Sequence, residues 1–252
     1  MSGDFNKDLV KAVAEETAGK VYNDLAHPTA KATGQIISFI PRTIKLWLGK
    51  WEKWILNGEY AIKETEKLLA EKLKEIPEER IIEPEPYIAV PAIQQLSYSL
   101  DSEELRELYA NLLASAMDKD FYGRIHPAFV DIIKQLAPDE AKLLRYLSNQ
   151  ELLPALEIRL RRAKGYILLD KCYMLIPDGV LDVPRNLSLY IENLCRLQLI
   201  EIPVDVYYIH EDVYSLLEGQ THYYDIAKEK LELKRKVVHF TEFGKYFLEI
   251  CV

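Results

Sequence analysis

Apolar side chains recur every three or four residues through most of this chain, with charged side chains between them. This is the period of an amphipathic helix, in which one face is buried and the other is solvated. Helices are expected over residues 5–32, 37–56, 59–75, 92–100, 103–118, 126–136 and 137–150. Asp101 or Ser102 is the expected cap of the fifth of these segments, since two glutamates follow in its first turn.

A proline-rich stretch interrupts the helical period. IPEERIIEPEPYIAVP, residues 76–91, contains four prolines. Proline lacks the backbone N–H that a helix needs, so we predict an extended connector and hinge over residues 77–91. This connector would separate an N-terminal helical region, residues 1–76, from a helical middle, residues 92–125.

From residue 126 onwards the pattern is mixed. Alternation in YILLDKCYMLI, residues 166–176, predicts a strand, and RKVVHF, residues 235–240, predicts another. A helix over residues 187–197 is expected to run into a short strand at residues 200–204, and Thr241 is expected to cap a final helix. DVYYIHEDVYSLLE and HYYDIAKEKLELK, which lie between these elements, fit neither period.

The order of helix, short strand, wing, strand and helix, with a Thr-x-x-Gly turn before the last helix, is typical of a winged-helix domain. The predicted fold class is therefore mainly α with a small β component. A winged-helix-like α/β region over residues 126–252 follows the helical parts.

Composition and charge support a globular chain of the cytoplasm. Of the 252 residues, 49% are hydrophobic and 29% are charged, which is enough to bury a core. The net charge of −8 argues against non-specific nucleic-acid binding by the whole surface. Cys172, Cys195 and Cys251 lie far apart, which fits a reducing compartment. No signal peptide and no membrane-spanning run is expected.

The sequence lacks the motifs of known chemistries, so we predict that the chain is not an enzyme and uses no cofactor. Walker A, G-x-G-x-x-G, G-x-S-x-G and H-E-x-x-H patterns are absent. His210 and His222 lie near two acids, but their spacing is not that of a metal site, and we interpret the stretch as a polar loop. His126 precedes a proline, which favours a capping or turn role over catalysis. No small-molecule site is evident.

All three tryptophans fall in ISFIPRTIKLWLGKWEKWIL, residues 37–56, among four basic residues and a single acid. Basic amphipathic helices with tryptophan bind membrane surfaces, but a helix packed in a core shows the same pattern. Globular proteins favour packing, and both alternatives stay open, as does a peripheral membrane location. The candidate membrane or partner face comprises Ile40, Ile44, Lys45, Trp47, Leu48, Lys50, Trp51, Lys53, Trp54 and Ile55.

Two basic clusters give a second candidate surface. KEKLELKRK, residues 228–236, falls where a wing would contact phosphates, and RLRRAK is at residues 159–164. The candidate recognition helix carries only Arg196, with Glu192, whereas base-reading helices present several basic or amide side chains. A protein partner or self-association is therefore favoured over nucleic acid. The candidate nucleic-acid contacts are Lys228, Lys230, Lys234, Arg235 and Lys236.

EELRELYANLLASAMDKD followed by HPAFVDIIKQLAPDEAKLLRYL resembles the Abi-alpha family of bacterial abortive-infection proteins. The similar block runs from Ile76 to about Leu147, and FTEFGKYFLEICV resembles the family's C-terminus. The resemblance implies an association with defence against phage, and it supplies neither a mechanism nor catalytic residues. Matching positions of unknown role are Asn111, His126, Pro127, Phe129 and Glu140.

Asn111 is a polar residue within an apolar run. Its side chain either lies at the rim of the core or is a buried amide that fixes a neighbouring backbone, and the sequence leaves both open.

The predicted function is a non-enzymatic anti-phage factor that acts through protein–protein contact. One alternative is a winged-helix nucleic-acid-binding protein. The other is a peripheral effector that perturbs membranes through residues 37–56.

Overall fold

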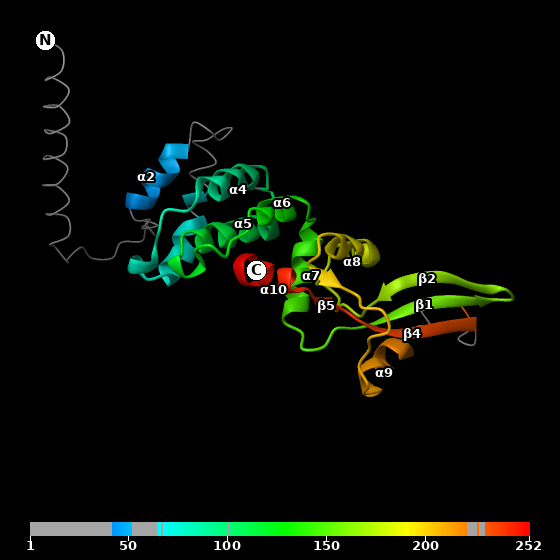
Figure 1. Cartoon of the computed structure of the whole chain (residues 1–252). Helices are drawn as coiled ribbons and strands as arrows, with labels where there is room; N and C mark the ends of the chain where they lie inside the picture. The colour runs from blue at the N-terminus through cyan, green and yellow to red at the C-terminus, as the bar shows by residue number, and fades with distance from the viewer. Residues whose placement is uncertain (1–41, 52–64, 67, 100, 221–225, 227–229) are drawn as a thin grey trace, which may run out of the picture. The chain divides into compact units, whose positions relative to one another are not determined.

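The computed structural model describes residues 42–51, 65–66, 68–99, 101–220, 226 and 230–252, and Figure 1 shows their arrangement. All of them belong to the compact unit Ser38–Val252. The described part is mainly α with a small β component, as the sequence predicts.

Helix α5 is the centre of the helical part, because the other helices of that part pack around it. Its neighbours are α4 (Pro86–Tyr98), α6 (Ala128–Lys134), α7 (Pro138–Ser148) and α10 (Glu242–Cys251). α5 itself spans Glu103–Ala116 and buries Leu108, Tyr109 and Leu112. Ser102 is its cap, since the Ser102 hydroxyl accepts a hydrogen bond from the Leu105 N–H at 3.3 Å. The predicted helices that correspond to α5, α6, α7 and α10 are confirmed within a few residues, whereas α4 begins well before the predicted start at residue 92.

The extended connector predicted over residues 77–91 is wrong in its second half, because α4 begins at Pro86 and continues through Pro91. Proline suits the first helical position, where no N–H partner is needed. The exposed Pro91 is tolerated inside the helix, because the opposite face of α4 is buried in the core through Ile88 and Ile93. Packing of an apolar face therefore outweighs the local preference against helix.

The first half of the predicted connector is also held in place. Glu78–Arg80 forms a single 3₁₀ turn, and Ile81 makes an isolated antiparallel bridge with Asp118. The Arg80 guanidinium donates to both carboxylate oxygens of Asp118, at 3.0 and 2.5 Å. Asp118 is almost fully buried, so this two-bond ion pair fixes the segment against the end of α5.

Two small antiparallel sheets complete the fold. The larger has the strand order β2-β1-β4, from β1 (Pro154–Arg162), β2 (Gly165–Tyr173) and β4 (Leu231–Val237). The smaller pairs β3 (Ile200–Glu201) with β5 (His239–Phe240). Strand β2 confirms the prediction for residues 166–176, whereas β1 was not predicted.

Helices cover the larger sheet only near its base (Figure 1). α8 (Leu187–Arg196) packs beside β2 and joins the main core. α9 (Asp212–Gly219) packs on β1, and its Tyr214 and Leu217 form a second apolar cluster with Leu156 and Ile158.

The predicted wing falls mostly on a strand of the larger sheet. Residues 228–236, where the sequence pattern places a wing, lead into β4, and β4 pairs with β1 and not with β3. The reason is that PALEIRLRR alternates apolar and charged residues and therefore forms a strand, which offers β4 a longer partner than the two-residue β3.

The end of α8 and the start of α10 form one joint. α8 ends in a Schellman turn, in which the Leu199 N–H donates to the Leu194 carbonyl at 3.0 Å and Gln198 adopts φ 58°. Thr241 then bonds to the same turn, because its N–H donates to the Leu199 carbonyl at 3.1 Å and its hydroxyl to the Gln198 carbonyl at 2.5 Å. The Thr241 hydroxyl also accepts from the Gly244 N–H at 2.8 Å and so caps α10 as predicted.

Side chains of α5 cap the C-terminal end of α10. The Asn111 amide donates to the carbonyls of Cys251 and Val252 at 3.0 and 3.3 Å, and the Ser115 hydroxyl donates to Ile250 at 3.1 Å. These carbonyls belong to the last helical turn, which has no partners within the helix. Asn111 is half-buried, so its side chain lies at the rim of the core, and its amide also fixes the neighbouring backbone of α10.

We expect Gly244→Ala to lower the free energy of unfolding by about 2–3 kcal/mol, as overpacking does. A Cβ at Gly244 would overlap the backbone carbonyl of Leu199, and backbone cannot move aside as a flexible side chain can. Urea unfolding followed by circular dichroism measures the change. Gly49→Ala is the matched control: its Cβ would meet empty space in α2 (Arg42–Trp51), so no loss of stability is expected. Equal midpoints for the Gly244 variant and the wild type would contradict the proposed close packing.

Candidate functional site

Asp139 is a buried carboxylate at the start of α7, and three donors surround it. The N–H groups of Asp182 and Val183 donate to its two oxygens at 2.9 and 2.8 Å, and the Tyr190 hydroxyl donates at 3.1 Å. Burial by itself would raise the pKa of Asp139, but these hydrogen bonds outweigh it and the pKa is lowered. Asp139 therefore ties α7 to the turn before α8 and to α8 itself.

Glu140 is equally buried and has the opposite pKa shift. Its Oε2 accepts from the Ala137 N–H at 2.7 Å and from the Asn193 amide at 2.9 Å. Burial raises the pKa of Glu140, although both hydrogen bonds and the nearby charge of Arg196 oppose the rise. The family-matching residue Glu140 thus joins α7 to α8.

Adjacent carboxyl groups with opposite pKa shifts can serve as a general acid and base. Here the geometry favours a structural role, because Asp139 and Glu140 are only 5% and 3% exposed and already accept hydrogen bonds from their own fold. A substrate would have to displace these donors to reach the carboxyl groups.

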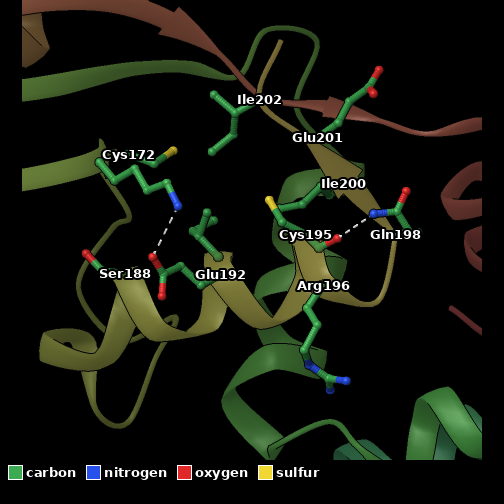
Figure 2. A pocket seen from close by; sticks show the side chains of 11 residues that line it. Cys172, Ser188, Glu192, Cys195, Arg196, Gln198, Ile200, Glu201 and Ile202 are labelled. Carbon is green, nitrogen blue, oxygen red and sulfur yellow. Dashed lines mark hydrogen bonds and ion pairs between the residues drawn. The ribbon is translucent and has the colours of Figure 1, made fainter. Parts of the chain in front are cut away.

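A cavity of about 570 Å³ lies between β2, α8 and β3 (Figure 2). Its volume is in the range of small-molecule sites. Its apolar lining comes from Cys172, Ile191, Cys195, Ile200 and Ile202. Polar groups lie around this lining, among them Glu192, whose carboxylate is 3.5 Å from the Lys171 ammonium. This cavity could not be inferred from the sequence, because its walls come from three separate elements.

The two thiols of the cavity are poor nucleophiles. Burial raises the pKa of Cys172 to about 12 and also raises the pKa of Cys195. Cys251, outside the cavity, is likewise raised by burial. Since the thiolate is the reactive form, the raised pKa makes each of these thiols less reactive than an exposed cysteine.

An exposed apolar loop joins β3 to α9. Its side chains Val204, Val206, Tyr207 and Ile209 all face solvent, and Val204 and Ile209 are 79% and 88% exposed. We name these four residues the apolar loop. Apolar side chains gathered in this way on a surface mark contact sites for other molecules more often than isolated ones do.

The apolar loop is anchored on both sides through Tyr208. The Tyr208 hydroxyl accepts from the Leu153 N–H at 3.1 Å, and the Tyr208 N–H donates to the Tyr214 hydroxyl at 3.1 Å. The Tyr214 hydroxyl in turn donates to the Lys236 carbonyl at 2.8 Å. The loop therefore presents its apolar side chains from a fixed base. The sequence left this stretch unassigned; its only signal is a run of apolar residues without helical or strand period.

The predicted face of residues 37–56 is described only in part. Leu48 is fully buried, and Trp47 is partly buried against the same core. The Lys50 ammonium lies 2.9 Å from the Glu83 carboxylate. These contacts support the packed alternative for this turn of α2, and none of the described helices is long and apolar enough to cross a bilayer.

The other residues of that predicted face cannot be placed in the same way. The backbone of α2 includes Ile44, Lys45 and Trp51, but the structure does not describe the side chains of these three residues. Residues outside the described part of the chain are Ile40, Lys53, Trp54 and Ile55.

The predicted nucleic-acid cluster is split by β4. Lys234 and Lys236 point to one face of the strand and Arg235 to the other, because side chains alternate along a strand. Arg235 is engaged there: its Nε lies 2.8 Å from a Glu218 carboxylate oxygen and its guanidinium 5.1 Å from the centre of the Tyr214 ring. Lys230 is exposed just before β4, and Lys228 is outside the described residues.

The remaining family-matching positions have structural roles. The His126 Nδ1 accepts from the Ala128 N–H at 3.1 Å, a bond over two residues that fits the expected capping or turn role before α6. Pro127 is the N-cap residue of that helix. Phe129 packs edge-on against Phe247, with ring centres 5.5 Å apart.

The polar-loop interpretation of the stretch from His210 to His222 is wrong, because Asp212–Gly219 forms α9, whose apolar face buries Tyr214. His210 is exposed, and His222 lies outside the described residues. The described residues contain no cluster of three or more side chains that could hold a metal ion.

Residues 57–251 match the family described as "Abortive infection alpha". No curated protein matches the sequence. A solved structure, an uncharacterized protein from the hydrocarbon-degrading marine bacterium Alcanivorax borkumensis SK2, is similar over 48% of this chain and 90% of its own. Its identity to this chain is 20% and the TM-score is 0.35, so the likeness is distant.

The pKa shifts of Asp139 and Glu140 predict opposite effects on stability. Asp139 binds its proton less tightly when folded, so its contribution is present at neutral pH and lost as pH falls through the lowered pKa. Glu140 binds its proton more tightly when folded, so stability falls as pH rises from the ordinary carboxyl pKa through the raised one.

We therefore expect Asp139→Asn to lower the free energy of unfolding by about 2 kcal/mol at neutral pH, with a smaller loss in acid. Glu140→Gln is the matched variant one residue away. It is expected to cost less at neutral pH, because a glutamine oxygen can still accept from Ala137 and Asn193 without a buried charge. Urea unfolding at several pH values checks both. An equal loss in the two variants at every pH would refute the opposite shifts.

Proposed function

This chain belongs to the abortive infection alpha family, and from that premise we propose that it restricts phage without an enzymatic step, by contact with a protein partner. The observation that carries the proposal is the apolar loop, which is exposed and yet anchored at its base. A loop whose backbone is fixed at Tyr208 loses less conformational entropy on binding than a free loop would, which favours a contact site.

The chemistry of the described residues supports a role without catalysis. The buried carboxyl groups of Asp139 and Glu140 accept hydrogen bonds that join α7 to α8. The pKa values of the three thiols are raised by burial. These groups stabilise the fold, whereas the side chains of the apolar loop form no part of either core cluster.

The position of the apolar loop also suits a contact role. It follows α8 and β3 and so begins the segment between the short strand and the next strand, at whose far end, residues 228–236, the sequence pattern places the wing. We extend the proposal to a winged-helix-like element, used for protein contact, in a cytoplasmic protein. The partner is either a second copy of this chain or another protein, and the two are separated by measuring the mass of the purified chain in solution.

We expect Val204→Asp/Ile209→Asp to abolish protection in bacteria that express the full chain, because charges would replace the two most exposed apolar side chains of the loop. Plaque counts on the expressing cells measure protection. Leu189→Asp/Tyr98→Asp is the matched control, since these exposed side chains lie on α8 and α4. Circular dichroism of each purified variant confirms folding.

Protection that survives in the folded loop variant would refute contact through the loop. Protection lost equally in the control pair would refute it as well. Nuclease, NADase or nucleotidase activity of the purified wild-type chain would refute the absence of an enzymatic step. If the wild type self-associates and the loop variant is monomeric, the partner is a second copy of the chain.

A further inference from the structure

The register of the larger sheet places many of its charged residues on one face. In the antiparallel pair β1–β4, Glu157 is opposite Lys234 and Arg159 is opposite Glu232. Directly opposed residues share a face, and the next residue along each strand points the other way. The apolar residues between these positions, such as Ile158, therefore face α9, and the charged residues lie on the face opposite to α9.

The same face carries two exposed apolar side chains of β2. Tyr166 is opposite Arg161 and Leu168 is opposite Arg159 in the pair β1–β2. Tyr166 and Leu168 are 53% and 47% exposed. We name this surface the open face; its residues are Glu157, Arg159, Arg161, Tyr166, Leu168, Glu232, Lys234 and Lys236. Figure 1 shows the outer parts of the strands running past α8 and α9. At the base of the sheet the face is partly covered: Lys236 is half-buried and lies opposite the fully buried Ala155.

On the open face, the Tyr166 ring stacks against the Arg159 cation. The Arg159 guanidinium lies 3.9 Å from the centre of the Tyr166 ring. Arg159 is held there by ion pairs with Glu157 and, at 3.8 Å, with Glu232. The Arg159 side chain is mostly buried, whereas Tyr166 is half-exposed, so the Tyr166 ring backed by the cation offers a stacking platform for a planar group.

Positive charge remains beside the platform. Lys234 and Lys236 form no ion pair with a described residue, and the Arg161 side chain is 63% exposed, with Glu232 at 3.8 Å. Arg162 and Lys164, at the end of the β1–β2 hairpin, add two exposed cations. The two carboxylates of the face are engaged by Arg159 and Arg161, so the local charge is positive in a chain whose net charge is −8.

We propose that the open face binds single-stranded nucleic acid. One base stacks on the platform of Tyr166 and Arg159, and the phosphates pair with Arg161, Lys234 and Lys236. Lys234 and Lys236 are two residues apart on one strand, about 6.6 Å, which suits neighbouring phosphates of an extended single strand. A duplex keeps its bases stacked inside and cannot use the platform.

This inference goes beyond the proposed function, since it concerns another surface and another partner. An acidic protein or an anionic membrane would also pair with the lysines. A membrane surface supplies no planar group to stack on Tyr166, and an acidic protein supplies one only where an aromatic side chain lies beside its acids. Every nucleotide of a single strand carries both a planar base and a phosphate, which is why single-stranded nucleic acid is favoured.

The first test measures binding of the full chain to fluorescein-labelled oligouridylate and oligothymidylate by anisotropy, over a range of salt concentrations. Three phosphate contacts predict a slope of log K against log salt of about −2 for a single strand. Lys234→Ala/Lys236→Ala should weaken binding and reduce the slope by about 1.4. Lys119→Ala/Lys134→Ala removes two exposed cations outside the sheet and should leave both unchanged.

The second test separates stacking from charge. Tyr166→Ala should weaken binding at least about fivefold, whereas Tyr166→Phe should keep it, since the ring and not the hydroxyl forms the platform. Tyr122→Ala, at another exposed tyrosine, should have no effect. Circular dichroism of all variants establishes that each is folded.

Absence of binding to either oligonucleotide at low salt would overturn the proposal. Equal losses in the sheet and control pairs, or tighter binding of the matched duplex, would do the same. Vesicles of phosphatidylserine and phosphatidylcholine, and polyglutamate, are tested with the same variants. If the Lys234/Lys236 variant loses binding to these but not to the oligonucleotides, the face contacts a membrane or an acidic protein and the proposal is wrong.

Discussion

The close approach of Gly244 to the Leu199 carbonyl is the contact on which the rest of the fold depends. It lets α10 begin directly against the Schellman turn of α8, where Thr241 already bonds to the backbone. From that point α10 runs beside α5 and buries Phe247 and Ile250 in the core. A side chain at position 244 would move the whole helix away from this joint, because the atoms that it meets are backbone.

Different kinds of interaction hold the two ends of α8 in place. Its last turn is bound by backbone hydrogen bonds and close packing, and its other turns by the buried acids Asp139 and Glu140 through Tyr190 and Asn193. Burying a carboxylate lowers the stability of the fold unless hydrogen-bond donors surround it. Removing one donor therefore destabilises the fold more than replacing both the carboxylate and its donor by apolar groups would. The helix held in this way packs against β2 and leads into β3, from which the apolar loop starts.

How much of this the sequence predicts depends on the range of the interactions. Helices α5 to α7 follow from their own period and caps, which are local. Pro91 misled the prediction because the packing that keeps α4 helical comes from other helices. Asp139 was correctly placed at a helix start, but its donors Asp182 and Val183 lie more than 40 residues away in sequence. The basic residues 234–236 formed one cluster in the sequence, and only the pairing of β4 with β1 shows that they face opposite sides.

One strand supports both of the surfaces that we assign to contact. Lys236 places its ammonium on the open face, while its carbonyl accepts from the Tyr214 hydroxyl that also holds the backbone of the apolar loop. A protein on the loop and a nucleic acid on the open face would thus be attached to the same few residues of β4, at a spacing set by the sheet. In such an arrangement, holding two partners together is the activity, and it needs neither a reactive thiol nor a free buried acid.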